Sequence, residues 1–296
     1  MDQELKLDAQ CARARDESER LASSIPSREL TDSRNALLAL EASRNTPALM
    51  RELPTPCTRF LRTLRESRLE AQVLRWMVLH QAASLPSTIE TSGLSNIPAV
   101  ESRYASHLKT VIDGDFDYSG EAEIFIKDLR FSLALSIPAG AWWVDIRSRM
   151  AARLGTWFAL RHPFSAIRRG AVNAPCLRLY VEPRRLEDFN EHSLIDAFQV
   201  CRDLLQMDSS LAGLTVKAWF VDPQVKSVSP RLAYLHDFAA ARGASFVRGK
   251  ASSKDIERAT MKSKTRRDLY KSGHYSPTPY SLFWERSSVL RNLEAR

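Results

Sequence analysis

The fold is decided by residues 177–220, LRLYVEPRRLEDFNEHSLIDAFQVCRDLLQMDSSLAGLTVKAWF. Apolar residues alternate with other residues over 177–181 and again over 216–220, which is the pattern of a half-buried strand. Between them, residues 190–207 place their apolar side chains three and four positions apart, as on one face of a helix. The stretch therefore predicts a strand, a helix and a second strand, and so a sheet that helices cover.

The flanking sequence extends this alternation of strands and helices. Apolar residues at every second position predict three further strands, over residues 129–137, 245–248 and 280–284. Helical spacing predicts helices over 142–158 and 252–272. We therefore expect an α+β or α/β fold, in which helices flank a mixed sheet and a helical N-terminal region precedes it.

The N-terminal region has the composition of helices. Residues 1–59 contain no Phe, Trp or Tyr, and leucines recur there among strong helix formers, with Thr31 or Asp32 as the expected N-cap. Residues 58–83 have the spacing of one amphipathic helix, whereas residues 84–100 are rich in Ser, Thr and Pro, as connectors are. The expected organisation is a helical region over 1–83, a linker over 84–103 and an α/β domain over 104–296 with a basic C-terminal helix.

Composition excludes several classes of protein. The 296 residues are 44% hydrophobic and 26% charged, which is typical of a globular protein. The charged N-terminus does not resemble a secretory signal, and no apolar run approaches the roughly 20 residues that span a bilayer, so we expect a cytoplasmic protein without a membrane span. The four cysteines lack zinc-ligand spacing, which predicts buried, reduced thiols and no metal site.

Positive charge is concentrated near the C-terminus. The net charge is +8, and residues 242–296 hold 13 basic and 5 acidic residues, a difference of +8. If 252–272 is one helix that opens at a capping box of Ser252 and Asp255, a basic residue recurs every four positions along one side, at Lys254, Arg258, Lys262 and Arg266. Such a stripe costs stability unless an anion offsets the repulsion. Arg266 and Arg267 suit bidentate phosphate binding, and Lys262, Tyr270 and Lys271 lie beside them. A solvated helix face is the alternative.

Two groups with acid–base chemistry precede this segment. Asp222 and Pro223 follow the strand over 216–220, and sheets of α/β proteins bind ligands beyond the carboxyl ends of their strands. Asp222 could equally cap a turn. Downstream, His236 stands beside Asp237 and could act as a general base if a carboxylate orients its ring, although surface histidines are commoner.

Three short motifs carry a resemblance. Residues 177–284 contain WFVDPQ at 219–224, SPRLAYL at 229–235 and TRRDLY at 265–270. This part of the chain resembles a group of functionally uncharacterised proteobacterial proteins. That resemblance covers a little over a third of the chain and implies no activity. The WxxDPQ segment, with Trp219 and Asp222, also resembles part of the C-terminal domain of some bacterial acyltransferase-like proteins. This second likeness implies group transfer.

Three functional hypotheses follow. The chain lacks P-loop, Rossmann, zinc-protease and nucleophile-elbow motifs. The leading hypothesis is a cytosolic acyltransferase that uses a phosphate-bearing donor such as a CoA thioester, with Asp222 and His236 as catalytic residues. Its expected substrate-binding or anion-binding residues are Trp219, Arg231, Lys262, Arg266, Arg267, Tyr270 and Lys271. The alternatives are a non-catalytic protein that binds nucleic acid or another polyanion through the basic helix, and an interaction or effector protein that docks through its N-terminal arm.

Overall fold

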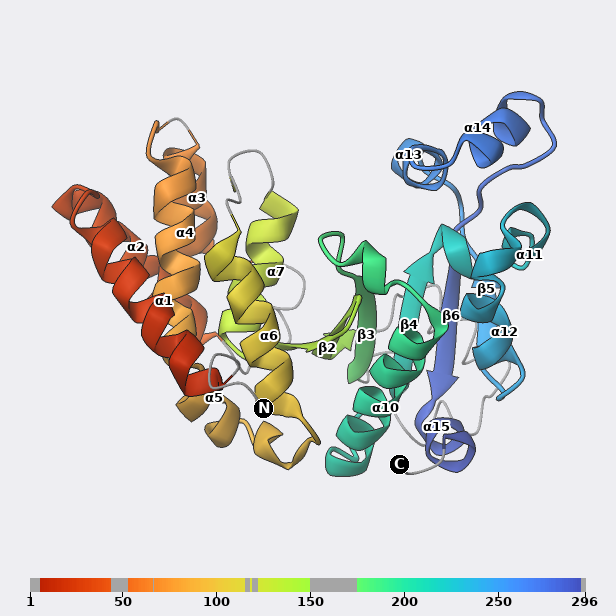
Figure 1. Ribbon diagram of the computed structural model, residues 1–296, viewed down its shortest axis with the longest axis horizontal. Helices are drawn as coiled ribbons and strands as arrows, with labels where there is room; N and C mark the ends of the chain where they lie inside the picture. The colour runs from red at the N-terminus through yellow and green to blue at the C-terminus, as the bar shows by residue number, and fades with distance from the viewer. Residues whose placement is uncertain are drawn as a thin grey trace. The chain divides into compact units, whose positions relative to one another are not determined.

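The computed structural model describes residues 6–43, 53–65, 67–114, 118, 122–149 and 175–293. The chain divides into two compact units, Met1–Ala139 and Gly140–Arg296 (Figure 1). The first is helical and the second holds most of a mixed sheet, so the expected α+β class with a helical N-terminal region is confirmed. Among the described helices, none has the length and apolar character that a bilayer crossing requires.

The first unit is a set of helices that ends in a short strand. Its elements are α1 (Leu7–Ala22), α2 (Ser27–Ala42), α3 (Thr55–Leu64), α4 (Glu70–Ala82), α5 (Leu85–Thr91), η2 (Leu94–Asn96), α6 (Val100–Asp113), α7 (Ala122–Ser132) and β1 (Ser136–Ala139). α4 packs against α1, α2 and α7. Apolar residues lie all round this helix, and Trp76 and Met77 are fully buried, as expected of a helix in the centre of a core.

Several N-terminal predictions are corrected. The helix expected over 58–83 is two helices, α3 and α4, and α2 begins at Ser27 after Pro26 rather than at Thr31 or Asp32. Pro26 is the N-cap, with φ −58° and an extended ψ of 148°, and proline is tolerated at a helix start because no hydrogen bond within the helix needs its missing N–H there. Where a linker over 84–103 was expected, the chain forms α5, η2 and the start of α6, and the chain passes from the first unit to the second between residues 139 and 140.

The strand expected over 129–137 is helical in its first part. α7 continues to Ser132, and only residues 136–139 form a strand. All side chains from 131 to 139 are buried, so the alternation of large and small residues does not separate a core side from a solvent side.

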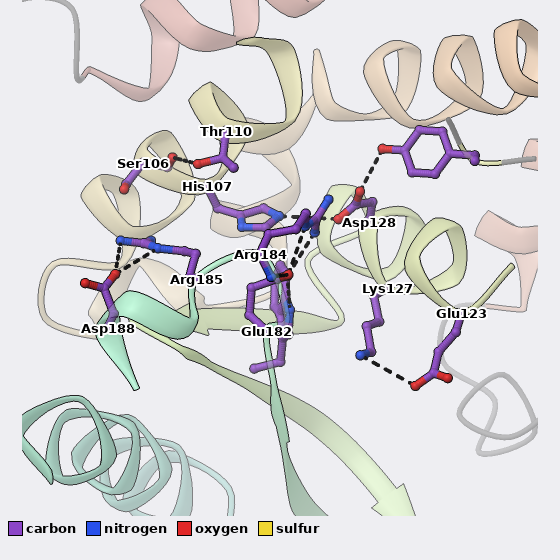
Figure 2. A network of polar contacts seen from close by, with 12 residues as sticks. Ser106, His107, Thr110, Glu123, Lys127, Asp128, Glu182, Arg184, Arg185 and Asp188 are labelled. Carbon is purple, nitrogen blue, oxygen red and sulfur yellow. Dashed lines mark hydrogen bonds and ion pairs between the residues drawn. The ribbon is translucent and has the colours of Figure 1, made fainter. Parts of the chain in front are cut away.

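On α7, Asp128 accepts a hydrogen bond from Tyr118 (2.7 Å), and its other oxygen lies 3.4 Å from His107 Nε2 (Figure 2). These contacts satisfy a buried carboxylate.

The second unit begins with two strands and the helix that follows them. Its first elements are β2 (Trp142–Arg149), β3 (Pro175–Val181), η3 (Leu186–Asp188), α10 (Glu191–Met207), β4 (Gly213–Ala218) and η4 (Trp219–Val221). The strands expected from the 177–220 stretch are confirmed as β3 and β4, although the second ends at Ala218, and the helix between them is α10. The helix expected over 142–158 is wrong over 142–149, which form β2, and its remainder lies outside the described residues.

The rest of the second unit completes the sheet. It comprises α11 (Val225–Val228), η5 (Pro230–Leu232), α12 (Tyr234–Ala240), β5 (Ser245–Arg248), α13 (Ser253–Thr260), α14 (Lys264–Lys271), β6 (Tyr280–Glu285) and α15 (Arg286–Asn292). The strands of this unit are ordered β2-β3-β4-β6-β5. β3 and β4 are parallel, with Leu179 opposite Val216, and the other pairs are antiparallel. α10 joins the parallel pair, packs on β2 and contacts α15, which also packs on β4 and β6.

The prediction that the four cysteines are buried, reduced thiols is confirmed. Cys11, Cys57, Cys176 and Cys201 are free and buried. Burial raises the pKa of the Cys11 and Cys176 thiols to about 12, because an apolar surrounding disfavours the thiolate. These thiols are packing groups rather than nucleophiles.

Candidate functional site

The candidate site lies at the carboxyl ends of β3 and β4, the parallel pair of the second unit. After β4 the backbone turns into η4, and after β3 it passes through η3 to Phe189. In Figure 1 the helices α13 and α14, in blue, lie beyond the end of the sheet where β4 finishes. In sheets that contain parallel strands, ligands bind beyond the carboxyl ends of the strands.

Four aromatic rings meet at this edge, and we call them the aromatic cluster: Trp142, Phe189, Trp219 and Phe220. The ring of Phe220 lies 5.9 Å from Trp142, 5.7 Å from Phe189 and 5.6 Å from Trp219, each in an edge-to-face arrangement. Trp142 is buried, and its indole N–H has no hydrogen-bond partner in the structure. The other three rings are half-buried, so the cluster has an inner end in the core and an outer end near the surface.

Arg266 lies against this cluster rather than in solvent. Its guanidinium carbon is 4.6 Å from the centre of the Trp219 ring, a cation–π contact. Its Nε donates to the carbonyl of Ala259 (2.5 Å), and its Nη1 donates to Ser229 Oγ (2.9 Å). Only 4% of Arg266 is exposed. The expectation that Arg266 faces an anion is wrong, because its guanidinium joins α13, α14 and the loop after α11.

The single basic helix expected over 252–272 is wrong, because the structure contains two helices there. The predicted capping box is confirmed: Asp255 N donates to Ser252 Oγ (3.2 Å), and Ser252 N donates to the Asp255 carboxylate (3.0 Å). α13 ends at Thr260, and α14 begins after Ser263, whose hydroxyl accepts from the backbone N–H of Arg266 (3.3 Å). This second N-cap and the repulsion between like charges both favour the break.

The break leaves four exposed cations together, and we call them the basic patch: Lys262, Lys264, Arg267 and Lys271. The last three share one side of α14, because residues three, four and seven apart fall on the same side of a helix. Arg267 Nη2 donates to the carbonyl of Met261 (3.1 Å), which holds the guanidinium at the turn between the helices. Among the described residues none of the four takes part in an ion pair, although the exposed Asp268, four positions after Lys264 and three before Lys271, lies on the same side of α14. Tyr270, 39% exposed, lies on the same helix.

The two arginines after β3, Arg184 and Arg185, are paired with carboxylates, unlike the cations of the basic patch. Arg184 forms a two-point contact with the buried Glu182 carboxylate (2.8 and 2.9 Å), which also accepts from Trp143 Nε1 (2.7 Å). Arg185 pairs with Asp188 at 2.8 Å (Figure 2). These cations therefore have carboxylate partners within the unit, in contrast to those of the basic patch.

Asp222 is a buried carboxylate with one oxygen unsatisfied. Its Oδ1 accepts from the backbone N–H of Gln224 (2.9 Å), so it does cap the turn. Its Oδ2 is buried without a hydrogen-bond partner in the structure, and only 2% of the residue is exposed. Burial raises the pKa of Asp222, whereas the nearby backbone N–H groups of Gln224 and Thr278 and the charges of Arg248 and His236 oppose this rise.

Tyr275 is the second buried group with an unsatisfied polar atom. It lies in the segment between α14 and β6, is 2% exposed, and its hydroxyl has no hydrogen-bond partner in the structure. Burial raises the pKa of Tyr275 to about 12; the charge of Asp222 adds to this rise and that of Arg266 opposes it. The fold thus brings Asp222, Tyr275 and Arg266 within electrostatic reach of one another.

The other two predicted residues lie on short helices nearby. His236 Nδ1 is 2.9 Å from Asp237 Oδ1, and the His236 ring lies 4.3 Å from that of Phe246. This carboxylate can therefore orient the imidazole. Arg231 is exposed on η5, the turn that precedes α12. On α12, Tyr234 Oη donates to the carbonyl of Phe189 (3.3 Å), which ties α12 to the aromatic cluster.

Sequence reasoning missed Phe189 and Phe220 because only the sheet brings them together. Within the described ranges, no group of three or more His, Cys, Asp or Glu side chains could hold a metal ion. No family model matches the chain, and neither a curated protein nor a solved structure is similar to it. The geometry of this edge of the sheet is therefore the basis for a functional assignment.

Proposed function

We propose that the second unit binds the phosphate backbone of a nucleic acid through the basic patch. The observation that carries this proposal is that the four cations of the basic patch are exposed on one helix and the turn before it, with Asp268 as the one carboxylate of α14 beside them. Four close cations raise the electrostatic energy of the folded protein, and an anion that binds them lowers it. Because Arg266 anchors α14 from beneath, the patch keeps its place despite the repulsion.

The form of the patch favours a polymer over a compact diphosphate. Its side chains extend outward from a turn and from the exposed side of a helix, so they meet successive phosphates of a chain more readily than one enclosed group. Arg266, which was expected to hold a donor phosphate, already donates to Ala259 and Ser229. Phosphate contacts alone carry no sequence information, so the proposed binding is independent of sequence.

Salt dependence tests the mechanism of binding. Neutralising four phosphates gives a slope of log affinity against log salt of about −3.6 for a duplex and about −2.8 for a single strand. The affinity for a labelled oligonucleotide, measured by fluorescence anisotropy, should therefore fall about 150-fold for a duplex and about 50-fold for a single strand between 50 and 200 mM salt. A flat salt profile would contradict phosphate binding.

Charge reversal locates the binding surface. We expect K262E/K264E/R267E/K271E to lose nearly all oligonucleotide binding. The matched control is R59E/R62E/R65E/R68E, which reverses four arginines that are exposed on and just after α3 and changes the net charge equally. The control should bind within about threefold of the wild type at moderate salt, where long-range charge is screened. Equal losses in the two variants would mean that overall charge, and not the patch, attracts the polymer.

A second candidate function is group transfer from a phosphate-bearing donor such as an acyl-CoA, with Asp222 as general base and His236 nearby. The unpartnered Oδ2 of Asp222, near Tyr275, favours it, because catalytic acids and bases often occupy such environments. Thermal unfolding with acetyl-CoA at 100 times its dissociation constant would show about 2.7 kcal/mol of stabilisation. A gain that persists as salt rises supports this function, and the lack of any gain opposes it.

A further inference from the structure

We infer that the outer rings of the aromatic cluster stack against unpaired bases, so that the nucleic acid is single-stranded. This inference rests on the proposed function, because the basic patch would supply the phosphate contacts. The stacking rings are Phe189, Trp219 and Phe220, which are half-buried at the carboxyl ends of β3 and β4.

The cluster and the patch belong to one continuous piece of structure. The Trp219 ring lies under the guanidinium of Arg266, which is the residue before Arg267 on α14. α13 packs against both η4, which carries Trp219 and Phe220, and α14. The patch is on the exposed side of α14 and Arg266 faces Trp219 from the inner side of the same helix, so the proposed strand has its phosphates on the patch and its bases turned around the edge of α14 toward the rings that follow β4.

The rings are held in place before any ligand arrives. Each ring contact in the cluster is tilted or edge-to-face, with centroids 5.2 to 5.9 Å apart. Trp142 closes the inner end in the core, and the hydroxyl of Tyr234 holds the backbone of Phe189. Fixed rings lose little conformational freedom when a base stacks on them, which favours binding.

Stacking distinguishes a single strand from a duplex. In a duplex the faces of the bases are covered by their neighbours, whereas an unpaired base can leave its stack and place its face on an aromatic ring. Positive charge beside aromatic rings is the combination by which proteins bind single strands without sequence preference. A duplex could use only the patch, so the protein should prefer the single strand.

The test compares a labelled 15-nucleotide strand with the matching duplex. F189L/F220L keeps apolar side chains but removes the ring faces, and it should weaken single-strand binding by at least about tenfold while duplex binding stays within twofold. The control is F238L, because Phe238 is a half-buried ring of the same unit that stacks on Phe198 outside the cluster. Thermal unfolding checks that each variant is folded. If F189L/F220L does not fold, W219F, which retains a ring beneath Arg266, replaces it, and quenching of tryptophan fluorescence by the single strand should fall.

The outcomes separate the two proposals. If the charge-reversed patch variant still binds both forms, the proposed function fails. Suppose that variant loses binding of both forms while F189L/F220L keeps the wild-type ratio of single-strand to duplex affinity. The stacking inference is then refuted and the proposed function stands. Equal binding of the two forms by the wild-type protein would also refute stacking.

Discussion

The guanidinium carbon of Arg266 lies 4.6 Å from the centre of the Trp219 ring, so a cation from α14 lies against an aromatic residue that follows β4. The same guanidinium donates to Ser229 and to the end of α13. One side chain therefore joins three segments that are distant in the sequence. The neighbouring Arg267 is exposed, and the two adjacent arginines have opposite roles.

Replacing Arg266 should destabilise the protein, whereas replacing Arg267 should not. R266A removes two hydrogen bonds from a charged donor and a cation–π contact, and it leaves Ser229 and the Ala259 carbonyl without their donor. We expect a loss of about 3 kcal/mol in the free energy of unfolding, measured by urea denaturation. R267A should stay within about 0.5 kcal/mol, as exposed substitutions usually do. Equal stabilities for the two variants would contradict the buried role of Arg266.

Asp222 should make the protein less stable at neutral pH than Asn would. Burial raises its pKa in the folded state above the ordinary value of 3.8, so the folded state favours the protonated form. The stability that this residue contributes is therefore complete at low pH and declines as pH rises through the folded pKa. D222N retains an oxygen for the Gln224 N–H, and its unfolding midpoint should exceed that of the wild type at pH 7. The difference should shrink toward pH 4, and a wild type that is more stable at pH 7 contradicts this account.

The Tyr275 hydroxyl should contribute nothing to stability. It is buried without a hydrogen-bond partner in the structure, and an unsatisfied buried polar group costs about 1–3 kcal/mol. Y275F removes that group and keeps the ring, so its free energy of unfolding should equal or exceed that of the wild type. A loss greater than about 1 kcal/mol in urea denaturation would show that the hydroxyl binds a partner, such as a water molecule shared with Asp222.

The contribution of the α13 capping box to stability should be measurable without a change in the basic patch. S252A removes the hydroxyl that accepts from Asp255 N, and we expect a loss of about 1 kcal/mol by thermal unfolding. S253A is the matched control, because Ser253 is the first residue of the helix and does not cap it. If the proposed function is correct, S252A should also leave oligonucleotide affinity within about twofold, since the patch lies on the turn before α14 and on α14 itself.

Local sequence determined the elements whose two sides differ in burial. The strand over 177–181 and the helix over 190–207 were predictable, because alternation or helical spacing of apolar residues reports which side faces the core. The strand over 280–284 was also predicted from alternation, although Leu282, Phe283 and Trp284 are all buried. The same reasoning failed for β2 and for the end of α7 with the segment after it, where Trp142 to Val144 and residues 131–139 are all buried. The capping box of α13 was also readable, since its two residues are only three positions apart.

The site itself depended on the tertiary structure. The sequence determined that basic residues gather near the C-terminus and that Asp222 follows a strand. It could not show that Arg266 turns inward while its neighbour stays outside, because both choices suit an isolated helix and only the position of Trp219 and Ser229 decides between them. Phe189 and Phe220, 31 positions apart, meet because β3 and β4 lie side by side. Spacing along a chain reports which side of an element is apolar, whereas a site is made by elements that only the packed sheet brings together.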